Sequence, residues 1–315
     1  MRALVIGGTG FVGTAACREL MRRGFETVAA SRREHPYGTF TSHVAFDRRD
    51  RAALKRVLDD VAPDVVLDLA CYQPAEVADV IEVFQGRRYV FVSTGVYPHA
   101  WTGQPAREEE FVPETGEPPS GELEYFTGKR WCETLLQRSG DFNWVVIRPP
   151  AVLGPGDPTL RIAAYIQRVE DRGPLLVPAE TYERRAGLAW VKDIGFACAL
   201  ASDVRRDIDR NAYNAAFDDV SLARLIAGLA AAMGRKPEMV PIPYAELPPS
   251  ASPYGPDPAR CAGYFIDKAR RELQFEPSQL EDALAETLAW YQVARPSHPG
   301  YANRAIELEL AAADR

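Results

Sequence analysis

Near its start the chain reads Ala3-Leu4-Val5-Ile6-Gly7-Gly8-Thr9-Gly10-Phe11-Val12-Gly13. The four apolar residues have the length of a buried strand, and the amphipathic stretch 12–22 that follows predicts a helix. Glycines at such a junction let the backbone approach a pyrophosphate, and the free N–H groups of the helix N-terminus attract the anion. The motif therefore predicts a dinucleotide site that uses Gly7, Gly10 and Gly13.

Outward from this motif, short apolar runs alternate with amphipathic stretches as far as residue 150. Near-continuous apolar strands separated by helices indicate a parallel sheet covered on both faces. We therefore expect an α/β fold with a doubly wound parallel (Rossmann) sheet. The expected strands are 3–6, 27–30, 44–46, 65–69, 89–93 and 144–147, and the expected helices are 12–22, 51–61, 75–84 and 124–138.

After Pro149 the alternation is less regular, which suggests a smaller C-terminal substrate-binding domain. We expect strands at 187–191 and 212–216, and helices at 159–169, 193–201, 221–233, 279–293 and 302–313. The proline-rich stretch 241–258 is expected to be an irregular surface segment and a candidate lid. The acidic stretch 107–110 is expected to be solvated, with a mobile flap over the substrate as the alternative. The predicted division assigns 1–152 and about 187–216 to the dinucleotide-binding domain, and about 153–186 and 217–315 to the substrate domain.

Composition excludes several classes of protein. The chain is 46% apolar and 26% charged, as in ordinary globular proteins, so disordered and fibrous classes are excluded. The formal net charge of −7 argues against nucleic acid as a partner. No apolar run has membrane-spanning length, and Met1-Arg2 before the first strand is not a signal-peptide pattern, so we expect a cytoplasmic protein. The five cysteines are scattered, which favours reduced thiols, and the four histidines are too far apart for a metal site.

The end of the second strand predicts which dinucleotide binds. An acidic residue there favours NAD, whereas an arginine favours the 2′-phosphate of NADP. This strand ends Ala30-Ser31-Arg32-Arg33, so Ser31 and Arg32 are candidate cofactor contacts and Arg32 favours NADP. Asp47 and Arg48 follow the third strand and are candidate contacts on the adenine side. Asp47 is alternatively a helix cap, in competition with Asp50.

Tyr125 and Lys129 stand four residues apart on a predicted helix, hence on one face. A phenol is a poor acid or base at neutral pH until a nearby cation stabilises its anion, and Lys129 supplies that charge. Ser93 and Thr94 are expected at the carboxyl end of a parallel strand, where a hydroxyl polarises a reacting oxygen. These four residues are the candidate catalytic group. A second Tyr-x-x-x-Lys, Tyr264 to Lys268, follows the completed sheet and is rejected because its members are expected on different elements.

These motifs together resemble an extended short-chain dehydrogenase/reductase of the NAD(P)-dependent epimerase/dehydratase family. The resemblance covers nearly the whole chain. Beyond the glycine motif and the Tyr125/Lys129 pair, it rests on Val92-Ser93-Thr94-Gly95-Val96-Tyr97, Arg148-Pro149-Pro150-Ala151-Val152-Leu153-Gly154-Pro155-Gly156, Val191-Lys192-Asp193-Ile194 and Lys268-Ala269-Arg270-Arg271-Glu272-Leu273.

The resemblance implies roles for individual residues. It makes Tyr125 the acid/base, Lys129 its partner and Ser93, four residues before Tyr97, the polarising hydroxyl. It implies dimerisation through the helix that bears the tyrosine. The contacts it implies are backbone contacts to the cofactor at Phe11 and Val12, ribose-side contacts at Leu69 and Ala70, nicotinamide contacts at Pro149 and Val152, and substrate contacts at Tyr97, Arg184 and Arg185.

This sequence departs from the family pattern at two places, which bear on the type of reaction and on the substrate. Gly95 and Val96 stand where dehydratases of this family carry an acidic pair, so dehydration is disfavoured. Asp68-Leu69-Ala70-Cys71 replaces the usual His-Leu-Ala-Ala, which is similar to a branch with varied substrates. The resemblance implies an NAD(P)-dependent enzyme acting on a secondary alcohol or ketone. We favour an epimerase of a nucleotide sugar or related polyol that works by transient oxidation and re-reduction. An NADPH-dependent ketoreductase and a non-catalytic dinucleotide sensor are the alternatives.

Overall fold

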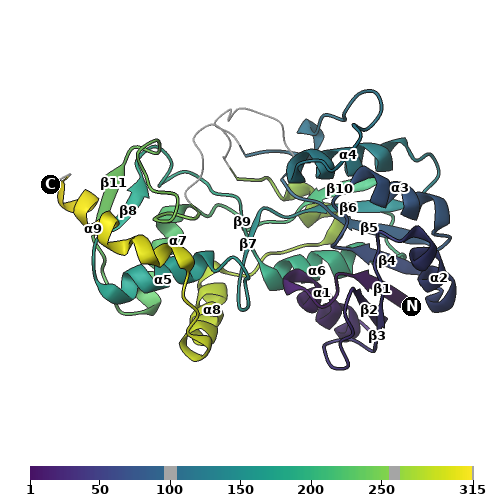
Figure 1. Ribbon diagram of the computed structural model, residues 1–315, viewed down its shortest axis with the longest axis horizontal. Helices are drawn as coiled ribbons and strands as arrows, with labels where there is room; N and C mark the ends of the chain where they lie inside the picture. The colour runs from purple at the N-terminus through teal and green to yellow at the C-terminus, as the bar shows by residue number, and fades with distance from the viewer. Residues whose placement is uncertain (96–104, 255–262, 314–315) are drawn as a thin grey trace.

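The larger part of the molecule is built on a seven-stranded parallel sheet, seen on the right of Figure 1. The computed structural model describes residues 1–95, 105–254 and 263–313. The strand order is β10-β6-β5-β4-β1-β2-β3, and every neighbouring pair is parallel. The strands are β1 (Arg2–Ile6), β2 (Glu26–Ser31), β3 (Ser42–Ala45), β4 (Val65–Asp68), β5 (Arg88–Val92), β6 (Trp144–Arg148) and β10 (Asn211–Asn214).

The order of the strands reverses at β1, which pairs with β2 on one side and with β4 on the other. Ile6, the last residue of β1, lies opposite Ala30 of β2 and Asp68 of β4. Open sheets of this kind bind ligands at the carboxyl ends of the strands, at this point of reversal. The predicted Rossmann fold is confirmed.

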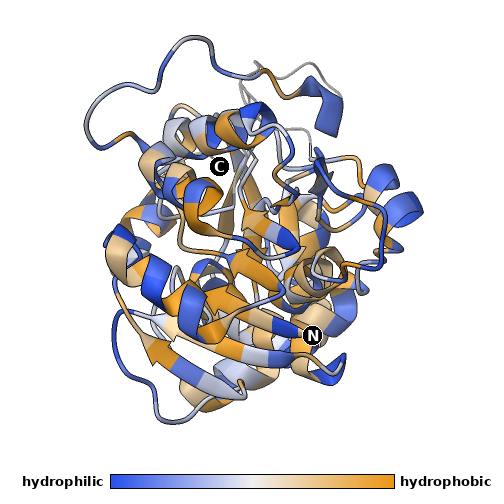
Figure 2. Cartoon of the chain, turned by 90° about the vertical axis from the view of Figure 1, so that its right-hand side faces the viewer, coloured by the Kyte–Doolittle hydropathy of each residue, from blue (hydrophilic) through white to orange (hydrophobic). Residues whose placement is uncertain are grey.

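Helices cover both faces of the sheet because its strands are apolar on both sides. Residues from α1 and α6 share one buried cluster with the sheet, and residues from α2, α3 and α4 share another. Figure 2 shows the apolar strands enclosed by helices whose outer faces are hydrophilic. These helices are α1 (Phe11–Arg22), α2 (Arg51–Val61), α3 (Pro74–Val83), α4 (Tyr125–Arg138) and α6 (Val191–Ala201).

The C-terminal part, on the left of Figure 1, has its own buried clusters. Two short parallel strand pairs, β7 with β9 and β8 with β11, support its helices. Its elements are β7 (Ala151–Leu153), α5 (Arg161–Asp171), β8 (Leu175–Pro178), β9 (Leu188–Trp190), α7 (Leu222–Ala232), β11 (Met239–Ile242), α8 (Leu280–Ala294) and α9 (Arg304–Ala313), with the short helix η3 (Pro299–Asn303). The short helices η1 (Glu108–Glu110) and η2 (Ala269–Leu273) pack on the sheet part instead, η1 against β10 and η2 against α6. The separate clusters support the two-domain division, which stays a proposal.

The proline-rich stretch is irregular over residues 243–254, as we expected, but only part of it lies on the surface. Its first residues belong to β11, and Leu247 and Ala251 are buried in a cluster with Leu176 and Ala311. These apolar side chains draw the segment onto the C-terminal core. Residues 243–254 contribute nothing to the wall of the cavity described below, so this part is no lid over it, and 255–258 lie outside the described residues.

The acidic stretch 107–110 also differs from expectation. Glu108 is buried, and its Oε1 accepts a 2.8 Å hydrogen bond from the backbone N–H of Asn214 on the edge strand β10. Burial raises the pKa of Glu108, and the hydrogen bond from Asn214 offsets part of that effect. An edge strand leaves backbone N–H groups unpaired, and this carboxylate satisfies one of them. In the described part of the chain, no helix is both long and apolar enough to span a membrane.

Candidate active site

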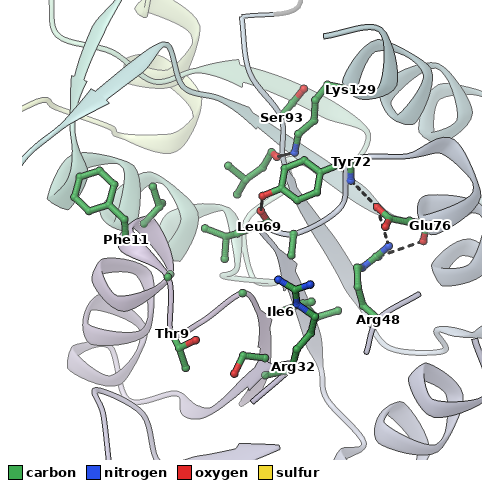
Figure 3. A pocket seen from close by; sticks show the side chains of 18 of the residues that line it. Ile6, Thr9, Phe11, Arg32, Arg48, Leu69, Tyr72, Glu76, Ser93 and Lys129 are labelled. Carbon is green, nitrogen blue, oxygen red and sulfur yellow. Dashed lines mark hydrogen bonds and ion pairs between the residues drawn. The ribbon is translucent and has the colours of Figure 1, made fainter. Parts of the chain in front are cut away.

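A cavity of about 640 Å³ opens at the carboxyl ends of β1, β2, β4 and β5 (Figure 3). Its volume lies within the range of cofactor pockets, about 300–1,000 Å³. The predicted cofactor and catalytic residues that line it are Gly7, Gly10, Phe11, Val12, Gly13, Ser31, Arg32, Asp47, Arg48, Leu69, Ala70, Ser93, Thr94, Tyr125, Lys129, Pro149 and Val152. The fold thus brings together residues that are far apart in the sequence, the most distant being Gly7 and Val152, 145 positions apart.

The glycine motif forms a tight turn between β1 and α1. Gly7 has a positive φ of 84° and donates a 2.9 Å hydrogen bond to Ala30 O, while Gly10 N donates to Gly7 O at 3.0 Å. A Cβ atom on Gly13 would overlap Gly7 O. Gly10 caps α1 without a side-chain hydrogen bond, so the first-turn N–H groups have no side-chain cap. This cradle fits the diphosphate of a dinucleotide.

Arg32 stands at the lower end of the cavity in Figure 3, just beyond β2. It is exposed, and no acidic side chain among the described residues forms an ion pair with it. Ser31 is less available, because its Oγ donates to Arg33 O at 2.9 Å and lies 2.8 Å from His43 Nε2. A guanidinium without a partner at this position suits an anionic group on the adenosine ribose.

Asp47 and Arg48 differ in their surroundings. Asp50 caps α2 by accepting a 3.0 Å hydrogen bond from Ala53 N, so Asp47 is not the cap and its exposed side chain lines the cavity. Arg48 is buried, and its Nη2 donates to Asp68 Oδ2 at 2.6 Å and to Glu76 O at 3.2 Å. Arg48 therefore reaches the cavity wall as part of a buried ion-pair network.

Lys129 projects from α4 to the carboxyl end of β5. It is 2% exposed, and its Nζ donates a 2.7 Å hydrogen bond to Val92 O. Burial lowers the pKa of Lys129, because removal from water disfavours the ammonium form. Figure 3 shows Lys129 and Ser93 together at the end of the cavity away from Arg32.

Tyr125 begins α4 and lines the cavity together with Thr94. Partial burial raises the pKa of Tyr125, and the side chain of Thr94 offsets part of that rise. The Nζ of Lys129 lies 5.9 Å from the Tyr125 ring centroid. Two other predicted catalytic residues, Thr94 and Lys129, thus lie near the phenol of Tyr125.

Ser93 completes this group from the end of β5. Its backbone N–H donates a 2.8 Å hydrogen bond to Ile147 O, which fixes it beside β6. Its Oγ is buried and has no hydrogen-bond partner among the described residues. A buried hydroxyl in a cavity wall with an unused donor is suited to polarise a substrate oxygen.

Nine residues of the cavity wall were not among the predicted site residues, and two of them, Tyr72 and Glu76, bring polar groups to the loop after β4. Tyr72 follows β4, and its ring lies beside Leu69 and Lys129 in Figure 3. Glu76 of α3 accepts a 2.6 Å hydrogen bond from Tyr72 N and forms an ion pair with Arg48. The departure from the usual His-Leu-Ala-Ala at residues 68–71 was the signal in the sequence that this loop differs.

Of the predicted substrate contacts, the two arginines are not brought to the cavity. Arg184 and Arg185 do not line it, and Arg185 forms a 2.6 Å ion pair with Asp219. Arg185 thus pairs with an acidic residue of the C-terminal part instead of lining the cavity. Tyr97 lies outside the described residues.

The rejected Tyr264–Lys268 pair does fall on different elements, since Tyr264 forms an isolated bridge with Ala106 and Lys268 is helical. Tyr264 nevertheless lies beside the site. Its hydroxyl occupies the space that a Cβ atom on Gly95 would fill, next to Thr94, and its ring fills the equivalent space at Gly187. The sequence gives no signal for this contact, which depends on how the chain returns from the C-terminal part.

Two proteins with curated descriptions are similar to this chain. The chloroplast stem-loop binding protein of 41 kDa b from Arabidopsis thaliana is 26% identical over 213 residues, 62% of this chain and 53% of that protein. The epimerase family protein SDR39U1 from Bos taurus is 29% identical over 173 residues, 50% of this chain and 56% of that protein. The chain therefore spans little more than half the length of either relative.

Solved structures share the fold at low sequence identity. The UDP-glucose 4-epimerase of Thermotoga maritima, determined with UDP-glucose, has a TM-score of 0.70 and 19% identity, covering 94% of this chain and 100% of that one. The UDP-glucuronic acid 4-epimerase of Bacillus cereus, determined with UDP-glucuronic acid and NAD, has a TM-score of 0.66 and 17% identity, covering 93% and 100%.

The sequence profile of one family matches most of the chain. It covers residues 3–79 and 74–216, which hold the glycine motif, the end of β5 and both Tyr125 and Lys129. This chain belongs to the NAD dependent epimerase/dehydratase family.

Proposed function

We propose that the cavity binds a nicotinamide dinucleotide and that the protein oxidises and re-reduces a secondary alcohol, as an epimerase of a nucleotide sugar or related polyol. The observation that carries the proposal is the grouping of Tyr125, Thr94, Ser93 and Lys129 at one end of the cavity that begins at the glycine turn. Such a cavity holds a long ligand with one end beside an acid/base group.

The dinucleotide would lie with its diphosphate on the N-terminus of α1, Leu69 and Ala70 beside a ribose, and Pro149 and Val152 beside the nicotinamide. When bound, it supplies a hydride acceptor and donor for the substrate carbon. Lys129 would hold the nearby ribose hydroxyls through its ammonium protons.

The proton chemistry falls to the protein's own side chains. The Tyr125 phenolate takes the proton of the substrate hydroxyl during oxidation, and the phenol returns it during reduction. Ser93 Oγ donates a hydrogen bond to the same substrate oxygen, which stabilises the charge that develops on it. Thr94 would stabilise the Tyr125 phenolate, because its side chain lowers the pKa of that phenol. Lys129 supplies a positive charge beside this group.

Arg32 favours NADP over NAD in this proposal. Its guanidinium has no acidic partner among the described residues and stands where the adenosine ribose is expected. Asp47 and Arg48 would lie on the adenine side of the cofactor. The Arg48 guanidinium is already bonded to Asp68, so Arg48 would contact the cofactor only as part of the cavity wall.

A nucleotide-linked sugar is the proposed substrate class. The support is family membership and the likeness in fold to epimerases solved with UDP-glucose and UDP-glucuronic acid. Tyr97 and Arg184 stay candidate contacts, whereas Arg185 would first have to leave Asp219. A homodimer formed through α4 and a cytoplasmic location also stay predictions.

A direct test incubates the purified protein with UDP-glucose or UDP-glucuronic acid and a catalytic amount of NAD or NADP, and follows the sugar protons by NMR. Conversion to the 4-epimer without net consumption of the dinucleotide is expected, and the Tyr125→Phe variant should lose it. Conversion that is unchanged in Tyr125→Phe would contradict the assignment.

The second candidate is an NADPH-dependent ketoreductase, which Arg32 favours because reductive enzymes that release their cofactor commonly use NADPH. Stoichiometric consumption of NADPH with a ketone substrate would establish it over the epimerase. A non-catalytic sensor is disfavoured, because Tyr125 and Lys129 are both retained and grouped, and the net charge of −7 is unfavourable for RNA.

A further inference from the structure

The ammonium group of Lys129 lies among aromatic rings. Its Nζ is 4.8 Å from the Tyr72 ring centroid, 4.7 Å from that of Phe91 and 5.9 Å from that of Tyr125. All three distances are within the roughly 6 Å at which a cation is attracted to the negative face of a ring. The rings come from three separate elements: the loop after β4, β5 itself and the first turn of α4.

No carboxylate among the described residues forms an ion pair with this ammonium. The carboxylates that act on the pKa of Lys129 are those of Asp68 and Glu133, and each of them forms an ion pair with an arginine. Asp68 Oδ2 accepts from Arg48 at 2.6 Å, and Glu133 Oε2 accepts from Arg148 at 2.5 Å. The thiols of Cys71 and Cys132, also close by, are buried and 3.8 Å apart.

A buried cation needs compensation for the water that it loses. Lys129 is 2% exposed and has one hydrogen bond, to Val92 O, so two of its three ammonium protons lack a protein acceptor among the described residues. The rings of Tyr72 and Phe91 are the remaining favourable surroundings. The charge therefore stays free of a counter-ion and available to the cavity.

The Tyr72 ring is held in place rather than free to turn away. Its backbone N–H donates a 2.6 Å hydrogen bond to Glu76 Oε2, and its hydroxyl donates to Leu69 O at 3.4 Å. Its carbonyl oxygen lies where a Cβ atom on Gly128 of α4 would be, so α4 packs directly on this residue. The loop and the helix that bears Lys129 thus fix the ring together.

We propose that Tyr72 is a positioning residue, whose ring, with that of Phe91, keeps Lys129 as a buried ammonium without a carboxylate partner. The unpaired charge is then directed to Tyr125 and to the ribose hydroxyls. The inference rests on the proposed function for its catalytic meaning, but the ring–ammonium interaction itself is a property of the free protein.

The test varies the electrostatics of the ring while its size stays nearly constant. Phenylalanine and its analogues with increasing numbers of ring fluorines are placed at position 72, starting from Tyr72→Phe, because fluorination weakens and then reverses the negative ring face. NMR titration of side-chain-labelled lysine reads the pKa of Lys129 directly, since the chain has only five lysines and Lys129→Met assigns the signal.

The expected result is a stepwise fall in the pKa of Lys129 with each added fluorine, by about 0.4 to 1.5 pH units over the series. Tyr72→Phe itself should keep a pKa close to that of the natural protein. The same analogues at Phe46, which lines the opposite part of the cavity, should leave the pKa unchanged. A pKa at position 129 that does not follow the fluorine series would overturn the proposal.

The two proposals fail in different ways. If the fluorine trend is present but no dinucleotide binds, the proposed function is wrong and the aromatic surroundings of Lys129 stand. If dinucleotide binds and Tyr125→Phe is inactive, but the trend is absent, the role of Tyr72 is wrong and the function stands. In an active enzyme, Tyr72→Leu should move the pH optimum and Tyr72→Phe should restore it.

Discussion

Asp68, the last residue of β4, accepts a 2.6 Å hydrogen bond from Nη2 of Arg48 beneath the cavity. The carboxylate also accepts from the Tyr89 hydroxyl and from Ala70 N, each at 3.0 Å. Asp68 is fully buried, so these three donors supply the hydrogen bonds that replace its lost contacts with water. Through its hydrogen bond from Ala70 N, the acid at this position orients the Leu69–Ala70 turn that forms part of the wall.

Asp68→Asn should lower the free energy of unfolding by about 1.5–3 kcal/mol, because it removes a buried charge-assisted hydrogen bond and leaves Arg48 with one ion pair among the described residues, at 3.3 Å to Glu76. Urea unfolding measures the loss. The matched control is Asp59→Asn, which removes the exposed 2.6 Å pair with Lys55 and should cost about 1 kcal/mol or less. Equal losses in the two variants would show that the buried pair does not stabilise the fold.

Arg32→Ala should weaken NADPH binding by roughly tenfold to a hundredfold and leave NADH binding nearly unchanged, since a charge-assisted hydrogen bond contributes about 1.5–3 kcal/mol. Calorimetric titration of each dinucleotide measures both affinities. Arg33→Ala is the control, because Arg33 is exposed and does not line the cavity. If Arg33→Ala had the larger effect, or NADH and NADPH were affected alike, Arg32 would not read the 2′-phosphate.

The bounds of the predicted helices and strands lie within two residues of those observed, because local signals mark them. Asp50 caps α2, and Glu124 accepts hydrogen bonds from Phe126 N and Thr127 N at the start of α4. The strands β8 and β11 were not predicted, since each is four residues long and contains a proline, and they pair with each other across more than 60 residues.

The glycine turn and the Tyr125/Lys129 spacing are local patterns, so the sequence predicts them directly. No local pattern of this kind marks Tyr72, Glu76 or Tyr264 as site residues. Their places at the site depend on how α3 and the segment after residue 263 pack against the sheet, and neither periodicity nor spacing encodes that packing. The buried Glu108 is a similar case, because its partner Asn214 is 106 residues away.

Thr94→Val should raise the pKa of Tyr125 further, by about one pH unit or more, because it removes the hydroxyl that stabilises the phenolate. The rise of the alcohol oxidation rate with pH, which follows formation of the phenolate, then moves to higher pH. Ultraviolet titration of phenol ionisation, with Tyr125→Phe subtracting the other tyrosines, measures the change. A pKa that stays constant or falls would refute the contact.

Gly95→Ala should lower the free energy of unfolding by about 1–3 kcal/mol, because the new methyl group overlaps the Tyr264 hydroxyl. The loss should be smaller in a Tyr264→Phe background, where that hydroxyl is absent. Urea unfolding of the four proteins in this double-mutant cycle gives the coupling. Strictly additive losses would mean that the two residues do not touch.

Dinucleotide binding at the glycine turn is the central claim, and titration of the free protein with NADPH and NADH, followed by nicotinamide fluorescence, tests it most directly. We predict saturable binding of at least one of them. Gly13→Ala should lose it while keeping its circular dichroism, because the methyl group overlaps Gly7 O, and Arg18→Ala on the exposed face of α1 should keep it. Absence of saturable binding by the folded natural protein, or undiminished binding by Gly13→Ala, would contradict the claim.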